Sequence, residues 1–302
     1  MVNSRRRARI DLLTSVLALI TTICLPHAAV RAATVAAPHV EAELVAESVS
    51  VKPGEPLWVA LRLKLEEGWH VYWRNPGDSG LPPHVTWELP VGSVAGALEW
   101  PVPRRFGLGP LVDYGYEGEV LLPSRLTLAQ DLRPGTTARL AARADWLVCK
   151  EACIPGKAAL SLELAVKSDD LSPDPRWARA LAQARSLLPR ALPEWRLKAA
   201  QSGDVVTLWV APSGEAGDPG QHPSAPSTET RFFPETPGQI ENAAPQQASR
   251  EGAGIRLTLE HAHSAREPLD RLRGLLVSPT AWSADGQTHG LVVDVAVTAP
   301  PR

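Results

Sequence analysis

Two neighbouring segments between Thr137 and Val166 constrain the fold most, because they match each other residue by residue. "TARLAARADWLV" and "IPGKAALSLELAV" each alternate apolar and polar residues, as half-buried strands do. With a three-residue turn between them, Val148 faces Ile154, so apolar side chains meet. In the same register Arg139 faces Glu163, which brings opposite charges together. A slip of one residue would mix the two faces, so the sequence predicts a long β-hairpin with a fixed register.

The predicted register also places Cys149 opposite Cys153 at the tip of the hairpin. Cys24 is the only other cysteine in the sequence. A structural bond, a redox-active pair and a metal site are the alternatives. A bond that closes a loop of about five residues contributes only about 2 kcal/mol by the chain-entropy relation, and the register is already fixed, which favours redox exchange. A metal site is not expected, since the chain has no second cysteine pair and Met1 is its only methionine.

Residues 1–33 have the three parts of a secretory signal peptide. Four arginines precede the apolar run "LLTSVLALITTICL", and small residues follow, which predicts cleavage after Ala32 or Ala33 and loss of Cys24. The mature chain would then reach the bacterial periplasm, an oxidising compartment in which disulfides form. Cleavage after Ala32 removes five arginines and one aspartate, so the formal net charge changes from −2 to −6. This acidity argues against nucleic acid or an anionic membrane as a partner.

Composition and turn spacing predict an all-β chain. Its 29 prolines and 22 glycines separate short apolar runs, and turn signals recur about every 8–12 residues, as in a β-sandwich. We predict one sandwich domain at residues 36–168 and a second at 195–302. Residues 169–194 should form a short helical linker, capped by Ser172 and ending around Pro189. A stretch rich in Pro, Gly and Ser in the second domain, "APSGEAGDPGQHPSAPSTET", predicts a mobile loop.

Four ordered motifs in the first predicted domain resemble one family. They are "WHVYWRNPGDSGLPPHVTWELP" at 69–90, "WPVPRRF" at 100–106, "YGYEGEVLLP" at 114–123 and "WLVCKEACIPG" at 146–156. Together they resemble the N-terminal periplasmic domain of the thiol:disulfide interchange protein DsbD family, in particular its ScsB-like members from the suppressor-of-copper-sensitivity group. The likeness spans about residues 40–165. The segment "RFFPETPGQIENAAPQ" at 231–246 resembles the second extracytoplasmic module of the same group.

The resemblance implies immunoglobulin-like domains and a role in thiol–disulfide exchange. In such domains a cysteine pair, here Cys149 and Cys153, receives electrons from a membrane-embedded carrier and passes them to thioredoxin-like periplasmic proteins, without a bound cofactor. The sequence contains neither the multi-helix membrane domain nor the C-terminal thioredoxin-like domain of that family, so the carrier would be a separate polypeptide, or the chain would be a truncated or non-catalytic relative. A role as a protein-disulfide reductase component, with links to cytochrome c biogenesis and copper tolerance, follows from the resemblance alone. The alternative is a non-catalytic periplasmic scaffold with a structural disulfide, which could also serve copper tolerance.

The resemblance further implies an aromatic-bearing loop that shields the cysteines. The candidate shielding or tuning residues are Tyr72, Trp73, Asp78, Tyr114 and Tyr116, together with the turn Asn75–Leu81. The residues themselves suggest plainer roles, since tryptophans in alternating segments belong to a core, and Asp78 and Asp113 are typical turn residues. His70 and His84 could tune a thiolate, but we expect them at the surface. Both sulfurs should face away from the apolar stripe of the hairpin, so we expect a partner to reach both.

Other catalytic classes lack support in the sequence. It contains no Gly-rich phosphate loop, no Ser-His-Asp arrangement and no paired carboxylate motif, so we expect neither a nucleotide-dependent enzyme nor a hydrolase. His261 and His263 lie on one face of a predicted strand but have no clear third ligand, so no metal is expected there.

Overall fold

The computed structural model describes residues 33–213, 226–265 and 267–299. Within these ranges the chain is built of β-strands and one short helix, α1 (Ala178–Ser186), which confirms the predicted all-β class. Nearly all of the predicted signal peptide and the centre of the predicted mobile loop lie outside the described residues. No helix in the described ranges is long and apolar enough to cross a membrane.

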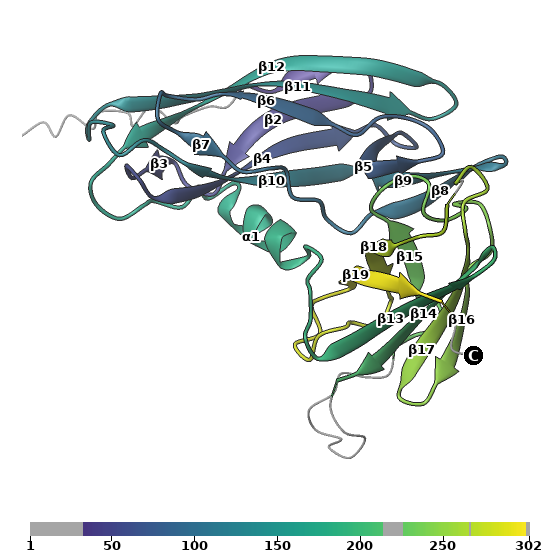
Figure 1. Cartoon of the computed structure of the whole chain (residues 1–302). Coiled ribbons are helices and arrows are strands. Elements are labelled where there is room, and N and C mark those ends of the chain that lie inside the picture. Colours follow the sequence, from purple (N-terminus) through teal and green to yellow (C-terminus); the bar gives the residue numbers. More distant parts are fainter. Residues whose placement is uncertain (1–32, 214–225, 266, 300–302) are drawn as a thin grey trace, which may run out of the picture.

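The N-terminal half forms a sandwich of two sheets (Figure 1). Its strands are β1 (Val35–Ala37), β2 (Val40–Ala46), β3 (Ser50–Val51), β4 (Pro56–Leu65), β5 (His70–Gly77), β6 (His84–Glu88), β7 (Val94–Ala95), β8 (Arg104–Leu108), β9 (Leu111–Glu117), β10 (Glu119–Thr127), β11 (Thr137–Cys149) and β12 (Cys153–Val166). One sheet has the order β1-β2-β4-β10-β7. The other has the order β3-β12-β11-β5-β9-β8, and β6 also pairs with β11.

Apolar side chains of the two sheets meet between them in a single core. Leu61 and Leu63 of one sheet and Leu140 and Val148 of the other are fully buried there. Each sheet can present one apolar face because successive side chains of a strand point to opposite sides. The tryptophans of the motif segments are buried in this core or packed against it, as predicted.

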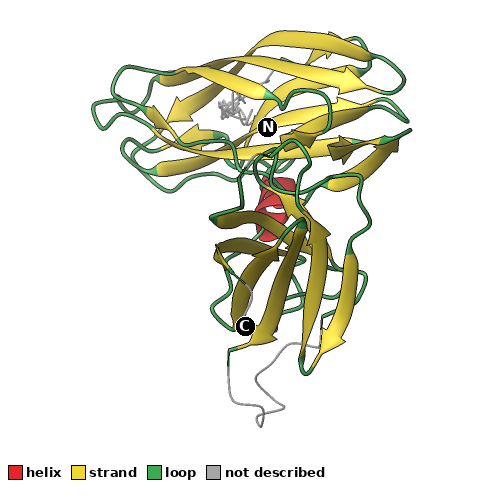
Figure 2. Cartoon of the chain, turned by 45° about the vertical axis from the view of Figure 1, so that its right-hand side comes forward, coloured by secondary structure: helices red, strands yellow, loops and turns green. Residues whose placement is uncertain are grey.

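The C-terminal part forms one further sheet around a second core. Its strands are β13 (Trp195–Ser202), β14 (Val205–Pro212), β15 (Arg231–Pro234), β16 (Gln247–Glu251), β17 (Gly254–Glu260), β18 (Arg271–Val277) and β19 (Gly290–Thr298). The sheet order is β15-β18-β19-β13-β14-β17-β16, and the sheet curls over buried residues such as Leu208 and Trp282 (Figure 2). This separate core is evidence for a second β-domain. The residue boundaries of the two domains stay predictions.

The hairpin of β11 and β12 has the predicted register. Val148 pairs with Ile154 and Cys149 pairs with Cys153. The predicted core face is also confirmed, because Trp146 and the alanines and leucines that alternate with it are buried in the first core. Gly156 lies opposite Trp146, and a Cβ there would clash with the indole ring. The glycine therefore makes room for the bulkiest side chain of the hairpin.

Helix α1 lies between the two β-regions, but it begins later than predicted. Its first residue is Ala178, well beyond the predicted cap at Ser172. The segment before it is bound to the first domain: the Val49 amide donates to the Ser172 carbonyl at 2.9 Å, and the Ser172 amide donates to the Ser50 hydroxyl at 3.2 Å. The helix begins only past this anchor, where the Ala178 amide donates to the Asp174 carbonyl at 2.9 Å.

Helix α1 packs on the outer face of the five-stranded sheet (Figure 1). Leu181 is fully buried against that sheet. Two arginine–tryptophan contacts flank it: the Arg62 guanidinium lies 5.2 Å from the ring centroid of Trp177, and that of Arg185 lies 4.8 Å from the ring centroid of Trp58. Cation–π contacts of this kind stabilise the docking of a helix that is too short to be stable alone.

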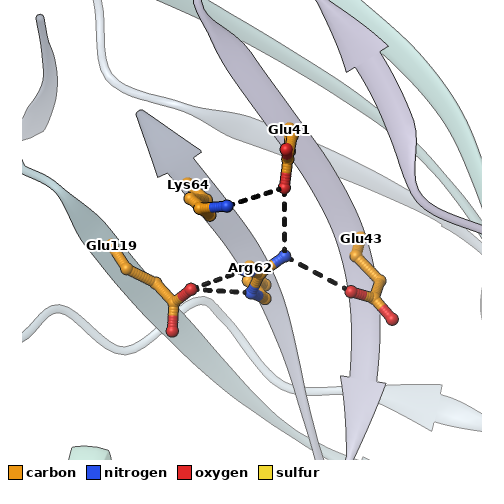
Figure 3. Close-up of polar contacts among 5 residues, drawn as sticks. All are labelled: Glu41, Glu43, Arg62, Lys64 and Glu119. Atoms are coloured by element: carbon orange, nitrogen blue, oxygen red, sulfur yellow. Dashed lines mark hydrogen bonds and ion pairs between the residues drawn. The ribbon is translucent and has the colours of Figure 1, made fainter. Parts of the chain in front are cut away.

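Arg62 is the centre of a charged cluster on the five-stranded sheet (Figure 3). Its guanidinium contacts Glu119 at 2.6 Å and Glu43 at 3.4 Å. Glu41 lies 4.0 Å from Arg62 and 3.4 Å from Lys64. Burial raises the pKa of Glu43, and the charge of Arg62 opposes that rise. The ion pairs link β2, β4 and β10. Because the carboxylates neutralise Arg62 and Lys64, the cluster is not a binding site for anions.

Candidate functional site

The two sulfurs at the hairpin tip form a disulfide and differ sharply in exposure. Cys149 ends β11 and Cys153 begins β12, with their Cα atoms 4.2 Å apart. Cys149 is 1% exposed, whereas Cys153 is exposed. The prediction that a partner reaches both sulfurs is therefore wrong for Cys149, because Tyr72 and His70 of β5 lie against that residue. An incoming thiol or disulfide meets Cys153 first.

Tyr72 of β5 contacts both sulfurs. Its hydroxyl donates to Cys149 Sγ at 2.8 Å and lies 3.3 Å from Cys153 Sγ. The side chain is fully buried, and burial raises the pKa of Tyr72, so the phenol stays protonated as a hydrogen-bond donor. The structure thus places one of the predicted shielding residues directly on the disulfide.

Residues 77–81 lie over the ring of Tyr72, and we call them the cover segment. Gly80 has a positive φ of 84° and sits so close to the ring that a Cβ would clash with it. The Ser79 amide and hydroxyl donate to the two carboxylate oxygens of Asp113 at 2.9 and 2.7 Å. The Asp78 carboxylate accepts from the Val112 amide at 2.7 Å. These bonds fix the cover segment to β9.

Asp113 differs from its prediction as a turn residue. It lies within β9 and is fully buried, because its carboxylate binds the cover segment. Asp78 does lie in the turn that follows β5, as predicted. The two acidic residues therefore act together, one from the strand and one from the turn that packs on it.

His70 is buried beside Cys149, not exposed as predicted. It lies directly opposite Cys149 in the pairing of β5 with β11 and is 3% exposed. Its ring stacks on Phe106 at 4.7 Å and meets the ring of Tyr72 edge-on at 5.2 Å. Burial lowers the pKa of His70, partly offset by the charges of Asp113 and Glu117. Its Nε2 is buried without a hydrogen-bond partner in the described chain.

Phe106 is the aromatic residue that sequence reasoning missed. It comes from β8, at the end of the "WPVPRRF" motif, and reaches the site through its stack on His70. The motif itself was the available signal, but nothing in it shows which aromatic residue it meets. His84, by contrast, is exposed as predicted.

The other aromatic candidates, Trp73, Tyr114 and Tyr116, have contacts with other residues of the described structure and not with the sulfurs. Trp73 is buried in the first core, on the opposite face of β5 from Tyr72. The Tyr116 hydroxyl donates to a backbone carbonyl before β8 at 2.8 Å, and the Tyr114 hydroxyl donates to Asn242 Oδ1 at 3.0 Å. Burial raises the pKa of both tyrosines. Tyr72 is thus the predicted residue that the structure brings onto the sulfurs.

The cysteine hairpin and its surroundings lie inside a recognised family region. Residues 38–165 match the profile described as thiol:disulfide interchange protein DsbD, N-terminal. This part of the chain belongs to the DsbD N-terminal domain family. The matched residues include the disulfide, Tyr72, the cover segment and Phe106. No curated protein sequence matches the chain well enough to count as a relative.

A solved structure resembles both β-regions. It is described as the crystal structure of the N-terminal periplasmic domain of ScsB from Proteus mirabilis. The two share 17% sequence identity with a TM-score of 0.62, over 87% of this chain and 97% of that one. This likeness confirms the immunoglobulin-like fold. A match to the crystal structure of the periplasmic chaperone SfaE covers 85% of this chain and 100% of that one. Its 9% identity and TM-score of 0.21 are too low to indicate a shared fold.

Proposed function

We propose that the chain is a periplasmic thiol–disulfide exchange module. It would carry reducing equivalents through Cys149 and Cys153 from a separate membrane-embedded carrier to thioredoxin-like periplasmic proteins. Membership of the DsbD N-terminal family supports the exchange chemistry, and the resembling ScsB structure is of a periplasmic domain. The observation that carries the proposal is the asymmetric pair, with an exposed Cys153 and a buried Cys149 that accepts a hydrogen bond from Tyr72.

The exchange begins at Cys153 because it is the exposed sulfur. In the reduced protein the Cys153 thiolate attacks one sulfur of the partner's disulfide, and the other partner sulfur leaves as a thiolate. Cys149, deprotonated, then attacks Cys153 Sγ, which forms the internal disulfide and releases the second partner thiolate. The pair loses two electrons, the partner gains them, and the protons of the two protein thiols pass to solvent and to the partner's thiolates.

Tyr72 would stabilise the thiolate that this step requires. A hydrogen bond to a charged acceptor is stronger than one to a neutral acceptor, so the Tyr72 hydroxyl favours the Cys149 thiolate over the disulfide. Burial of Cys149 acts in the opposite direction, because a desolvated thiolate is disfavoured. The hydrogen bond from Tyr72 therefore offsets the cost of burial and allows Cys149 to act as the resolving thiolate.

Serine substitutions test which sulfur meets the partner. We expect reduced Cys149→Ser to form a stable mixed disulfide between Cys153 and a purified single-cysteine thioredoxin activated as its thionitrobenzoate disulfide, because thionitrobenzoate leaves and neither protein then keeps a second thiol that could release the adduct. Cys153→Ser should trap little, since Cys149 is buried. Non-reducing electrophoresis and peptide mass spectrometry measure the adduct. Absence of any adduct with Cys149→Ser, or equal yields from both variants, would contradict the proposed order.

The alternative is a periplasmic interaction module with a structural disulfide, and the burial of Cys149 is the observation that favours it. Equilibration with glutathione separates the two. An exchange-active pair should have a midpoint potential of about −150 to −260 mV, whereas a structural bond should lie below about −300 mV. A link to copper tolerance or to cytochrome c biogenesis rests on the family resemblance alone.

A further inference from the structure

One residue of the second domain binds three elements of the first domain around the disulfide. Asn242 lies between β15 and β16 and is 8% exposed. Its Nδ2 donates to Asp78 Oδ1 at 2.7 Å, and its Oδ1 accepts from the Tyr114 hydroxyl at 3.0 Å. Its backbone carbonyl accepts from Arg105 at 3.3 Å. Asn242 thus joins the cover segment to β9 and to β8, the strand that carries Phe106.

A second contact anchors the residues that precede the cover segment. The Asn75 side chain is fully buried and donates through Nδ2 to the Pro234 carbonyl of β15 at 2.7 Å. Its Oδ1 accepts from the Gly77 amide at 3.2 Å. Figure 1 shows β15 and β18 beneath β5, β8 and β9, so these bonds cross the junction of the two domains.

The contacts continue without a break from Asn242 to the sulfurs. Asn242 binds Asp78, whose neighbour Ser79 is held by Asp113. Gly80 then packs closely against the ring of Tyr72, and the Tyr72 hydroxyl donates to Cys149. Each link is a short contact, and Asn242, Asp113 and Tyr72 are buried, so a change at one end can displace the hydroxyl at the other.

We propose that the second domain supports the redox pair, with Asn242 as a positioning residue that holds the cover segment against Tyr72 and so keeps the Tyr72 hydroxyl on Cys149. This inference deepens the proposed function and rests on it for the biological use of the pair. The chemistry it concerns is the balance between disulfide and dithiol. A thiolate accepts the Tyr72 hydrogen bond more strongly than a disulfide sulfur does, so a well-placed hydroxyl favours the reduced form.

The test is the midpoint potential of the full chain, measured by thiol trapping across a glutathione series. Tyr72→Phe removes the hydroxyl and should disfavour reduction about tenfold, which is about 30 mV more negative for a two-electron couple. Asn242→Ala should shift the potential in the same direction by a smaller amount. The double variant should equal Tyr72→Phe alone, because Asn242 acts through the hydroxyl that is already missing.

Glu235→Gln is the matched control. Glu235 pairs with Arg74 across the same domain junction at 3.0 Å but does not bind the cover segment. It should leave the potential unchanged. Equal shifts in Glu235→Gln and Asn242→Ala, or additive shifts in the double variant, would overturn the proposal. If Asn242→Ala does not fold, Asn242→Ser takes its place and must show the same direction.

The result also separates this inference from the proposed function. A wild-type potential below about −300 mV with the Asn242 shift intact would refute the exchange role and uphold the support by the second domain. A potential in the exchange range that Asn242 substitutions leave unchanged would uphold the function and overturn the inference.

Discussion

Cys149 experiences two opposing influences, both set by single residues around it. It is closed in by Tyr72 and by His70, which are themselves buried. This desolvation disfavours a thiolate, while the Tyr72 hydroxyl at 2.8 Å favours it. His70 adds no positive charge at neutral pH, because burial lowers its pKa. Of these two side chains, the neutral hydroxyl of Tyr72 is therefore the one that favours the thiolate.

His70 should make the stability of the protein sensitive to acid. Its pKa is lowered in the folded protein, whereas an unfolded imidazole titrates near the ordinary value of about 6.5. The unfolded state therefore binds the proton more readily, and the free energy of unfolding falls as the pH drops below about 6.5. Urea unfolding at pH 7.5 and pH 5 should show a smaller loss for His70→Gln than for wild type. His84→Gln, at an exposed site, is the control, and an equal loss in all three proteins would contradict the assignment.

At the scale of elements, the β11–β12 hairpin is the rigid base of the site. Its register agrees with its own side-chain pairs, and it places Cys149 and Cys153 opposite each other. The close pairing of Trp146 with Gly156 fills the core beneath the tip. The residues packed around the tip come from β5, β8 and the cover segment.

Gly156→Ala should destabilise this hairpin. A Cβ at Gly156 would clash with the indole of Trp146, and overpacking of a filled core costs about 1–3 kcal/mol. The midpoint of urea unfolding measures the loss. Gly107→Ala is the matched control, because Gly107 also lies in a strand but has open space around it, and it should change stability by less than about 0.5 kcal/mol. Similar effects of the two substitutions would show that the indole contact is not the cause.

The whole molecule is joined by apolar contact as well as by polar bonds. Phe233 of β15 belongs to the C-terminal sheet, yet it packs with the core of the first domain and its ring lies 5.1 Å from that of Tyr114. Leu275 of β18 joins the same cluster. Burial of these side chains across the junction should couple the unfolding of the two domains.

Phe233→Ala should weaken that coupling. Truncation of a buried phenylalanine costs about 3–5 kcal/mol, and the loss falls on the junction. Calorimetry should show one unfolding transition for wild type and two resolved transitions for the variant. Val205→Ala, at an exposed site on the second domain, should retain one transition. A single transition in Phe233→Ala would mean that the domains are coupled by other contacts.

The sequence by itself determined the all-β class, the hairpin register and the opposition of Cys149 and Cys153, because these follow from alternation and pairing between nearby residues. Only the tertiary structure decided which sulfur is buried. Tyr72 meets Cys149 across 77 positions of sequence, and Asp78 meets Asn242 across 164. No local period records such contacts. They form only when separate strands and the two domains pack together. The environment of the cysteine pair therefore depends on contacts between residues far apart in the sequence, which local alternation of apolar and polar residues does not predict.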